Sequence, residues 1–304
     1  MRRGIDALLY NFFIMMILLS PFLYYLYLKR DPYCPMEGFQ DAPLVSGEAF
    51  KNQCKYNLDD RYPIIPYDSS LKEGDRVFMK VRDIPLFLQS PPSVKITAII
   101  GNNDETFDDD MMVRLKPYIM GVYAVNCSAH GAKQIPMGFR DDRYTPHKVM
   151  VDILNEPSPE RDILCLVNFI LGTNGSERTK ARDSFKGKVW ATISDDYMNY
   201  NTNKSLDHSD PETMKRRKDY YSMLKRTKFV ICPPGAGIDT HRVYETLYFG
   251  GTPVIKSSFL DSMYERLGGC WIIKDWSEVT EEECNRRWLQ RQAMPRLNVS
   301  DWLH

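Results

Sequence analysis

The feature that most constrains the fold of this chain is a repeated alternation of short apolar runs with segments of helical length. The segments between the runs, such as 211–226 and 241–249, are long enough for helices. This alternation predicts an α/β fold with parallel sheets. The runs, which have the length of buried strands, lie at 76–81, 94–100, 121–126, 162–169, 188–192, 229–232, 252–255 and 270–273.

A linker is predicted to divide this α/β body into two lobes. The stretch 141–159 holds three prolines and many charges, as a segment between domains commonly does. We therefore expect an N-terminal lobe at 75–150 and a C-terminal lobe at 151–304. Residues 31–74, rich in Pro, Asp, Gly and Tyr without clear periodicity, are expected to form a stem and an irregular segment.

An uncharged run near the N-terminus predicts a membrane anchor. Residues 7–28 carry no charge, and a helix of this length spans roughly 33 Å, close to the hydrocarbon thickness of a bilayer. The alternative is a secretory signal peptide, whose apolar core is usually about 7 to 15 residues and ends in small residues. Here bulky Tyr and Leu continue up to Lys29. Residues 1–30 are thus expected to form a short cytosolic tail and an uncleaved anchor.

The orientation of this anchor is expected to be type II. The free amino terminus adds a positive charge on the cytosolic side. The rest of the chain carries acceptor triplets for N-glycosylation, which suit a body in the lumen of the Golgi or the endoplasmic reticulum. These triplets begin at Asn126, Asn174, Asn203 and Asn298.

Composition excludes two broad classes. The chain has 40 basic and 40 acidic side chains, so it lacks the basic excess of a nucleic-acid-binding protein. Its hydrophobic content of 43% excludes disorder as its main character. The seven cysteines form no CxxC pair, which argues against a zinc site. Cys34 and Cys54 are placed to form a disulfide in an oxidising lumen, while Cys165 and Cys232 are expected in the core.

The most informative stretch is 228–259, KFVICPPGAGIDTHRVYETLYFGGTPVIKSSF. A strand ends at two prolines, and Gly235 and Gly237 let the backbone approach a ligand closely. Asp239 or Thr240 is expected to cap a helix that begins near His241. A glycine turn that leads into a helix N-terminus directs several N–H groups at one point, which suits a diphosphate.

Two charged residues of this helix extend the prediction. Arg242 adds a guanidinium beside the diphosphate, and Glu245, three residues later on the same face, offers oxygens to the hydroxyls of a ribose. The alternative is an exposed ion pair between the two, worth about 0.2–0.5 kcal/mol. The loop lacks the GxGxxG and GxxxxGKS patterns, which excludes the dinucleotide fingerprint and the kinase-type P-loop.

The order CPPGAGIDTHRVYETLYFGGTPVI resembles the nucleotide-sugar motif of the exostosin-like glycosyltransferases. Weaker similarity extends through DILCLVNF, YYSMLKRTKFVICP, AIIGNNDETF and IPMGF, so that the resemblance covers about 76–283. It implies a membrane-anchored GT-B protein of two Rossmann-like lobes, in which the C-terminal lobe holds the nucleotide sugar and the N-terminal lobe the acceptor. The first lobe is short, about 65 residues from Arg76 to Arg140, so a reduced first sheet is expected.

Sugar transfer also needs a base for the acceptor hydroxyl. Asp104 follows the strand ITAII and is our candidate, with Asn102 and Asn103 as acceptor ligands. The alternative is an ordinary turn in which Thr106 or Asp108 caps the next helix. The acidic run 108–110 leaves a metal-binding role open as well, although helix capping is favoured.

Together with these residues, the resemblance implies a glycosyltransferase of hexosyl or pentosyl type that moves a sugar from a nucleoside-diphosphate sugar, a UDP-sugar in the first instance, to a glycan or glycoprotein acceptor. Inversion is expected, and neither a divalent metal nor another cofactor is. The alternative is a catalytically inactive relative that binds glycans or assembles other proteins at the membrane. A homodimer or heterodimer is compatible with either. The candidate catalytic residues are Asp104 and Arg242, the candidate acceptor ligands are Asn102 and Asn103, and the candidate donor-binding residues are Gly235, Gly237, Thr240, His241, Arg242, Glu245 and Lys256.

Overall fold

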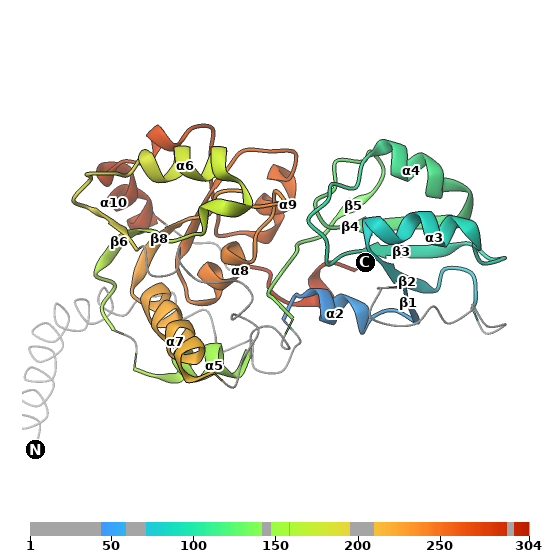
Figure 1. Cartoon of the computed structure of the whole chain (residues 1–304), viewed down its shortest axis with the longest axis horizontal. Helices are drawn as coiled ribbons and strands as arrows, with labels where there is room; N and C mark the ends of the chain where they lie inside the picture. The colour runs from blue at the N-terminus through green and yellow to red at the C-terminus, as the bar shows by residue number, and fades with distance from the viewer. Residues whose placement is uncertain are drawn as a thin grey trace, which may run out of the picture. The chain divides into compact units, whose positions relative to one another are not determined.

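The computed structural model describes residues 44–58, 71–141, 147–157, 159–194, 210–290 and 295–303. They contain two five-stranded parallel sheets with helices around them (Figure 1). The predicted α/β class is confirmed, and the two sheets are consistent with Rossmann-like lobes. The predicted membrane segment, 7–28, lies outside the described residues. Within the described ranges, no helix has the length and apolar character needed to cross a bilayer.

The first sheet has its strands in the order of the chain. Each predicted strand of this lobe is confirmed, with bounds shifted by a few residues. Two short strands that the sequence pattern missed flank them at the edges of the sheet. The order is β1 (Tyr56–Asn57), β2 (Arg76–Met79), β3 (Ile96–Ile100), β4 (Ile119–Ala124) and β5 (Lys133–Gln134).

Short helices connect the strands of the first sheet. Asp108 occupies the N-cap of α4 and accepts a hydrogen bond from the Met111 amide at 3.0 Å, which confirms the capping interpretation of this acidic residue. Pro85 stands at the start of α3, where its missing N–H removes no helical bond. The elements are α2 (Gly47–Lys51), η1 (Val81–Asp83), α3 (Ile84–Gln89), α4 (Asp109–Leu115) and η2 (Lys116–Tyr118).

The second sheet has a different strand order. All five predicted strands are confirmed, and they lie in the order β10-β9-β8-β6-β7. The chain therefore moves from β6 to one side of the sheet and then returns to the other side of β6 with β8. The strands are β6 (Ile163–Val167), β7 (Ala191–Ile193), β8 (Thr227–Ile231), β9 (Thr252–Lys256) and β10 (Trp271–Ile273).

The predicted helices of the second lobe are also confirmed. The side chain of Asp210 accepts from the Thr213 amide and begins α7, with Pro211 as its first residue. The helical elements are α5 (His147–Asn155), η3 (Leu171–Thr173), α6 (Gly175–Asp183), α7 (Pro211–Lys225), α8 (His241–Tyr248), α9 (Asp261–Leu267), η5 (Trp276–Glu278), α10 (Glu281–Gln290) and η6 (Val299–Asp301).

One face of the second sheet carries a core of alternate strand residues. Cys165, Val167 and Phe169 pack there with Trp271 and Trp276. Cys165 and Cys232 are both buried, as expected of small core residues. Cys34, the proposed disulfide partner of Cys54, lies outside the described residues.

Segments from both ends of the described chain lie at or beside the first sheet. β1 belongs to this sheet and comes from the segment 31–74. Near the C-terminus, Leu297 O accepts a hydrogen bond from Val45 N at 2.8 Å, and Leu303 O accepts one from Arg76 Nη2 at 3.1 Å. Pairings between residues so distant in sequence leave no local pattern in the sequence.

Gly138 makes a close backbone contact with the segment before α2. Its φ is +75°, and a methyl group there would lie 2.1 Å from the Val45 carbonyl oxygen. Phe139, the next residue, donates its N–H to the same oxygen at 2.8 Å. Only glycine combines this backbone conformation with this approach.

We expect Gly138→Ala to lower the free energy of unfolding by at least about 2 kcal/mol, because it adds backbone strain and a steric clash. Gly175→Ala, at the first position of α6 with no neighbouring atom within 4 Å, is the control and should change it by less than about 0.5 kcal/mol. Denaturant titration measures both. Equal effects at the two glycines would contradict this interpretation.

Candidate functional site

The strand order identifies where the second sheet can bind a ligand. In open parallel sheets, ligands bind beyond the carboxyl ends of the strands at the point where the strand order reverses. Here that point lies between β6 and β8, which are neighbours in the sheet. The first sheet, in its described strands, follows chain order throughout and has no such point. The turn after β8, which begins at Cys232, is therefore at the favoured position.

The glycine turn after β8 packs against the beginning of α6. Arg178 donates from Nε to the Pro234 carbonyl at 3.0 Å, and Asn174 donates from Nδ2 to the Gly235 carbonyl at 3.3 Å. A methyl group at Gly235 would lie 2.8 Å from Arg178 Nη2. Sequence reasoning missed Arg178 and Asn174, because nothing in their local sequence distinguishes them from an ordinary helix start.

Gly237 contacts the loop that carries the candidate base. A methyl group at Gly237 would lie 2.7 Å from Asn126 Nδ2 and 3.0 Å from the Asp104 carbonyl oxygen. The structure therefore brings the glycine turn and the Asp104 loop together. Burial raises the pKa of the Asp104 carboxyl above its ordinary value, and the neighbouring Glu105 adds to the shift.

Asp239 does not cap α8. Its carboxylate accepts hydrogen bonds from the Met137 amide at 2.8 Å, from the Tyr264 hydroxyl at 3.0 Å and from the Tyr244 hydroxyl. Thr240 occupies the N-cap position without a side-chain cap bond, so the prediction of a side-chain cap was wrong. The N–H groups at the start of α8 therefore lack the side-chain acceptor that a cap would have supplied.

Arg242 and Glu245 are connected through a tyrosine that sequence reasoning missed. Tyr220, on α7, donates its hydroxyl hydrogen to Glu245 Oε2 at 2.9 Å, and Arg242 Nη1 donates to the same hydroxyl at 3.1 Å. Glu245 is 9% exposed, so the alternative of an exposed ion pair was wrong. Burial raises the pKa of Glu245, while the charge of Arg242 opposes this shift.

His241 is held as a neutral ring. Its Nδ1 lies 2.7 Å from the Gly138 carbonyl oxygen, which only accepts hydrogen bonds, so Nδ1 carries the proton and Nε2 is an acceptor. Burial lowers the pKa of His241 to about 4, and the charge of Arg140 contributes. At neutral pH, His241 therefore adds no positive charge beside a diphosphate.

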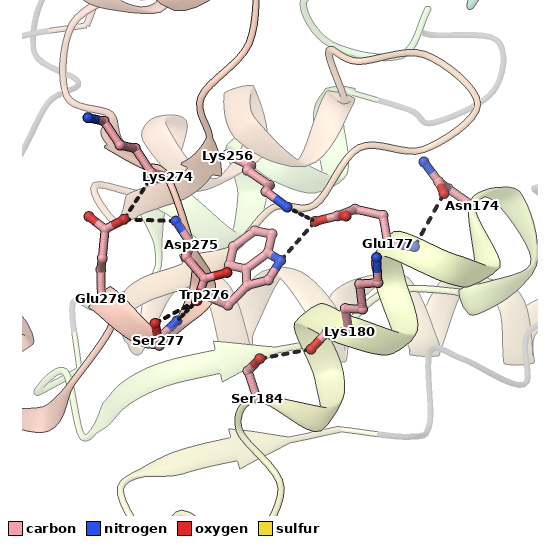
Figure 2. A network of polar contacts seen from close by, with 10 residues as sticks. All are labelled: Asn174, Glu177, Lys180, Ser184, Lys256, Lys274, Asp275, Trp276, Ser277 and Glu278. Atoms are coloured by element: carbon pink, nitrogen blue, oxygen red, sulfur yellow. Dashed lines mark hydrogen bonds and ion pairs between the residues drawn. The ribbon is translucent and has the colours of Figure 1, made fainter.

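Lys256 is engaged with other partners. Its Nζ lies 3.0 Å from Glu177 Oε1, and Trp276 Nε1 donates to that same oxygen at 3.0 Å (Figure 2). Trp276 is 2% exposed and belongs to the core cluster of the second sheet. Lys256 thus lies at the carboxyl end of β9 as predicted, but in an ion pair with α6.

The two candidate acceptor ligands differ in their environments. Asn102 has a φ of +57° and donates to Asp141 Oδ2 at 3.1 Å. Asn103 is 7% exposed; its Nδ2 donates to the Glu105 carbonyl at 2.8 Å. Its Oδ1 is buried and has no hydrogen-bond partner in the part of the chain that the structure describes. Asn103 therefore has a buried, unsatisfied oxygen to offer to a ligand.

The acidic run at α4 is engaged locally. Besides the cap at Asp108, Asp109 accepts hydrogen bonds from the His130 amide at 2.7 Å and pairs with its ring at 2.9 Å. Over the described ranges, three or more His, Cys, Asp or Glu side chains nowhere gather in a way that would hold a metal ion.

Residues 161–304 match the family model of the RXYLT1 C-terminal domain, a family related to the exostosin-like glycosyltransferases. The match covers slightly less than half of the chain. It includes the whole second sheet, the glycine turn and α8. No curated protein matches the chain.

The raised pKa of Glu245 predicts a pH-dependent stability difference. A carboxyl whose pKa is higher in the folded state than its ordinary value, 4.5, destabilises the fold as pH rises through the folded-state pKa. Glu245→Gln should therefore be more stable than the wild type at pH 7 in the absence of ligand, and this difference should shrink as pH falls toward 4.5. Thermal melting over pH measures it.

A difference in thermal stability between the wild type and Glu245→Gln that stays constant across pH would contradict the raised pKa of Glu245.

Proposed function

We propose that this protein is a membrane-anchored glycosyltransferase that moves a sugar from a nucleoside-diphosphate sugar, a UDP-sugar in the first instance, to a glycan or glycoprotein acceptor. Two independent observations support the proposal. The family match covers the second sheet, and the glycine turn lies where strand order alone favours a ligand. The second observation carries the assignment of the donor to this lobe.

The donor is proposed to bind through the turn and α8. The N-terminus of α8, which begins at His241, directs its dipole toward the diphosphate. Gly235 and Gly237 let the turn pack closely against Arg178 and the Asp104 loop, which holds the turn in place beside this N-terminus. Arg242, positioned by Tyr220, supplies a guanidinium for the leaving phosphate. Lys256 can contact the phosphate only if its ion pair with Glu177 breaks.

Glu245 is proposed to hold the ribose. One of its oxygens, Oε2, accepts the Tyr220 hydroxyl. Among the described residues, no hydrogen bond to its other oxygen is found, so Oε1 can accept a ribose hydroxyl. A buried carboxylate gains most from such a bond, because it has lost its water.

Asp104 is proposed as the base that removes the proton of the acceptor hydroxyl, with Asn102 and Asn103 orienting the acceptor. The raised pKa of Asp104 lies closer to neutral pH than that of an ordinary aspartate. A base whose pKa is nearer the working pH accepts a proton more effectively. Attack by the acceptor oxygen on the anomeric carbon then expels the nucleoside diphosphate in one displacement with inversion. The leaving charge is offset by Arg242 and α8, so we propose that no divalent metal is needed.

The anchor at 7–28 is proposed to tether this body in the lumen of the Golgi or the endoplasmic reticulum, where glycan and glycoprotein acceptors occur. Asn126 of the first glycosylation triplet is 1% exposed and both its amide atoms are hydrogen-bonded, so this triplet is not available after folding. Dimerisation with itself or a related transferase is compatible with this arrangement.

Arg242→Ala should reduce or abolish the rise in melting temperature that UDP or a UDP-sugar gives to the full chain. At 100 times the dissociation constant, a ligand stabilises by about 2.7 kcal/mol. Arg226→Ala is the matched control, since Arg226 is an exposed arginine paired with Asp162 on the surface; it should retain the full effect.

Asp104→Asn should retain donor binding but lose at least about 100-fold in turnover, as expected when a base is removed. Sugar transfer to a glycan acceptor panel, with and without EDTA, measures this. A wild-type chain that binds nucleotide but transfers no sugar would instead support a catalytically inactive glycan-binding relative. Loss of activity with EDTA would contradict the metal-independent mechanism.

A further inference from the structure

An asparagine at the end of β6 is buried with an unsatisfied side chain. Asn168 is 2% exposed, and its Oδ1 has no hydrogen-bond partner within the described residues. A buried polar atom that is left unpaired destabilises the fold, because it has lost its hydrogen bonds to water. Such atoms are uncommon in folded proteins, and a ligand that supplies the missing partner explains one at a binding site.

The alternation along β6 determines the face on which Asn168 lies. Cys165, Val167 and Phe169 all pack into the core cluster on one face of the sheet. Because successive strand residues point to opposite faces, Asn168 lies on the other face. On β8, Phe229 and Ile231 belong to the same core cluster, so Cys232 lies on the same face as Asn168.

This shared face is the one next to the proposed donor site. The parallel register of β6 and β8 continues to place Asn168 beside Cys232. Burial raises the pKa of the Cys232 thiol to about 12, and the charges of Arg242 and Glu245 also act on this thiol. Asn168 is thus next to a residue whose thiol lies within electrostatic range of both candidate donor ligands, at the point where the strand order reverses.

The unsatisfied atom also limits the ligand group that it can bind. Oδ1 of an amide accepts hydrogen bonds and does not donate them. The oxygens of an ionised diphosphate are acceptors too, so they cannot satisfy it. A hydroxyl of the ribose or of the transferred sugar can.

We propose that Asn168 is a donor-binding residue whose carboxamide oxygen accepts a hydrogen bond from a sugar hydroxyl of the bound nucleotide sugar. This inference rests on the proposed function, and it adds a residue from the first strand of the lobe to a site otherwise built from the turn after β8 and from α8. The ligand-free protein keeps the unsatisfied amide, and the donor relieves it.

The test compares Asn168→Leu with the wild type in the full chain. Removing an unsatisfied polar group should leave the ligand-free melting temperature unchanged or higher, while the dissociation constant for the donor rises about 10-fold or more. Binding is measured with UDP and with a panel of UDP-hexoses and UDP-pentoses. Val167→Ala is the matched control: it truncates the adjacent residue on the core face, and should lower the melting temperature while the dissociation constant is retained.

The two ligands separate the two sources of the hydroxyl. Weaker binding of UDP as well as of UDP-sugars would assign Asn168 to the uridine part of the donor, and weaker binding of UDP-sugars alone would assign it to the transferred sugar. An unchanged dissociation constant in Asn168→Leu, with the wild type binding normally, would overturn this inference and leave the proposed function standing. A wild type that binds no nucleotide would overturn both.

Discussion

The buried carboxylate of Asp239 is the interaction on which the arrangement of the site depends. Asp239 is 2% exposed and comes from the turn before α8, yet it accepts a hydrogen bond from Met137, which follows β5 of the first sheet. Its own N–H donates to Asn126 Oδ1 at 2.9 Å. Asn126 in turn donates to the Asn103 carbonyl at 3.2 Å. Backbone and side-chain bonds thus connect the glycine turn with the loop that carries Asp104.

The two sheets that this connection joins contribute different residues to the candidate site. The second sheet has the reversal in strand order that creates a binding position, and its turn and α8 carry Arg242 and Glu245. The first sheet has no such reversal of strand order in its described strands, and it contributes the loop that carries Asp104. In the proposed reaction, the donor lies at the second sheet and the acceptor near the first. Their relative position must be fixed, because transfer depends on the positions of the reacting atoms to within about 1 Å.

Much of the fold could be predicted from the sequence, because buried parallel strands form short apolar runs that are visible without a structure. The turn after β8 was likewise evident from its prolines and glycines. The roles of Tyr220 and Arg178 were not evident, since both residues reach the site from helices that are distant from the turn in sequence. The role of Asp239 was misjudged for the same reason: a helix cap is a local pattern, whereas its partners Met137 and Tyr264 are brought to it only by folding. The strands β1 and β5 were too short to give a periodic signal.

Every role proposed for the second lobe depends on a nucleotide that binds beyond the carboxyl ends of β6 and β8. Hydrogen–deuterium exchange of the full chain, with and without saturating UDP, tests it most directly. We expect slower exchange at amides in 168–174 and 233–245, where the ligand orders the backbone, and little change in β2, β3 and β4. Protection confined to the first sheet, or no protection at a UDP concentration that saturates binding, would contradict it.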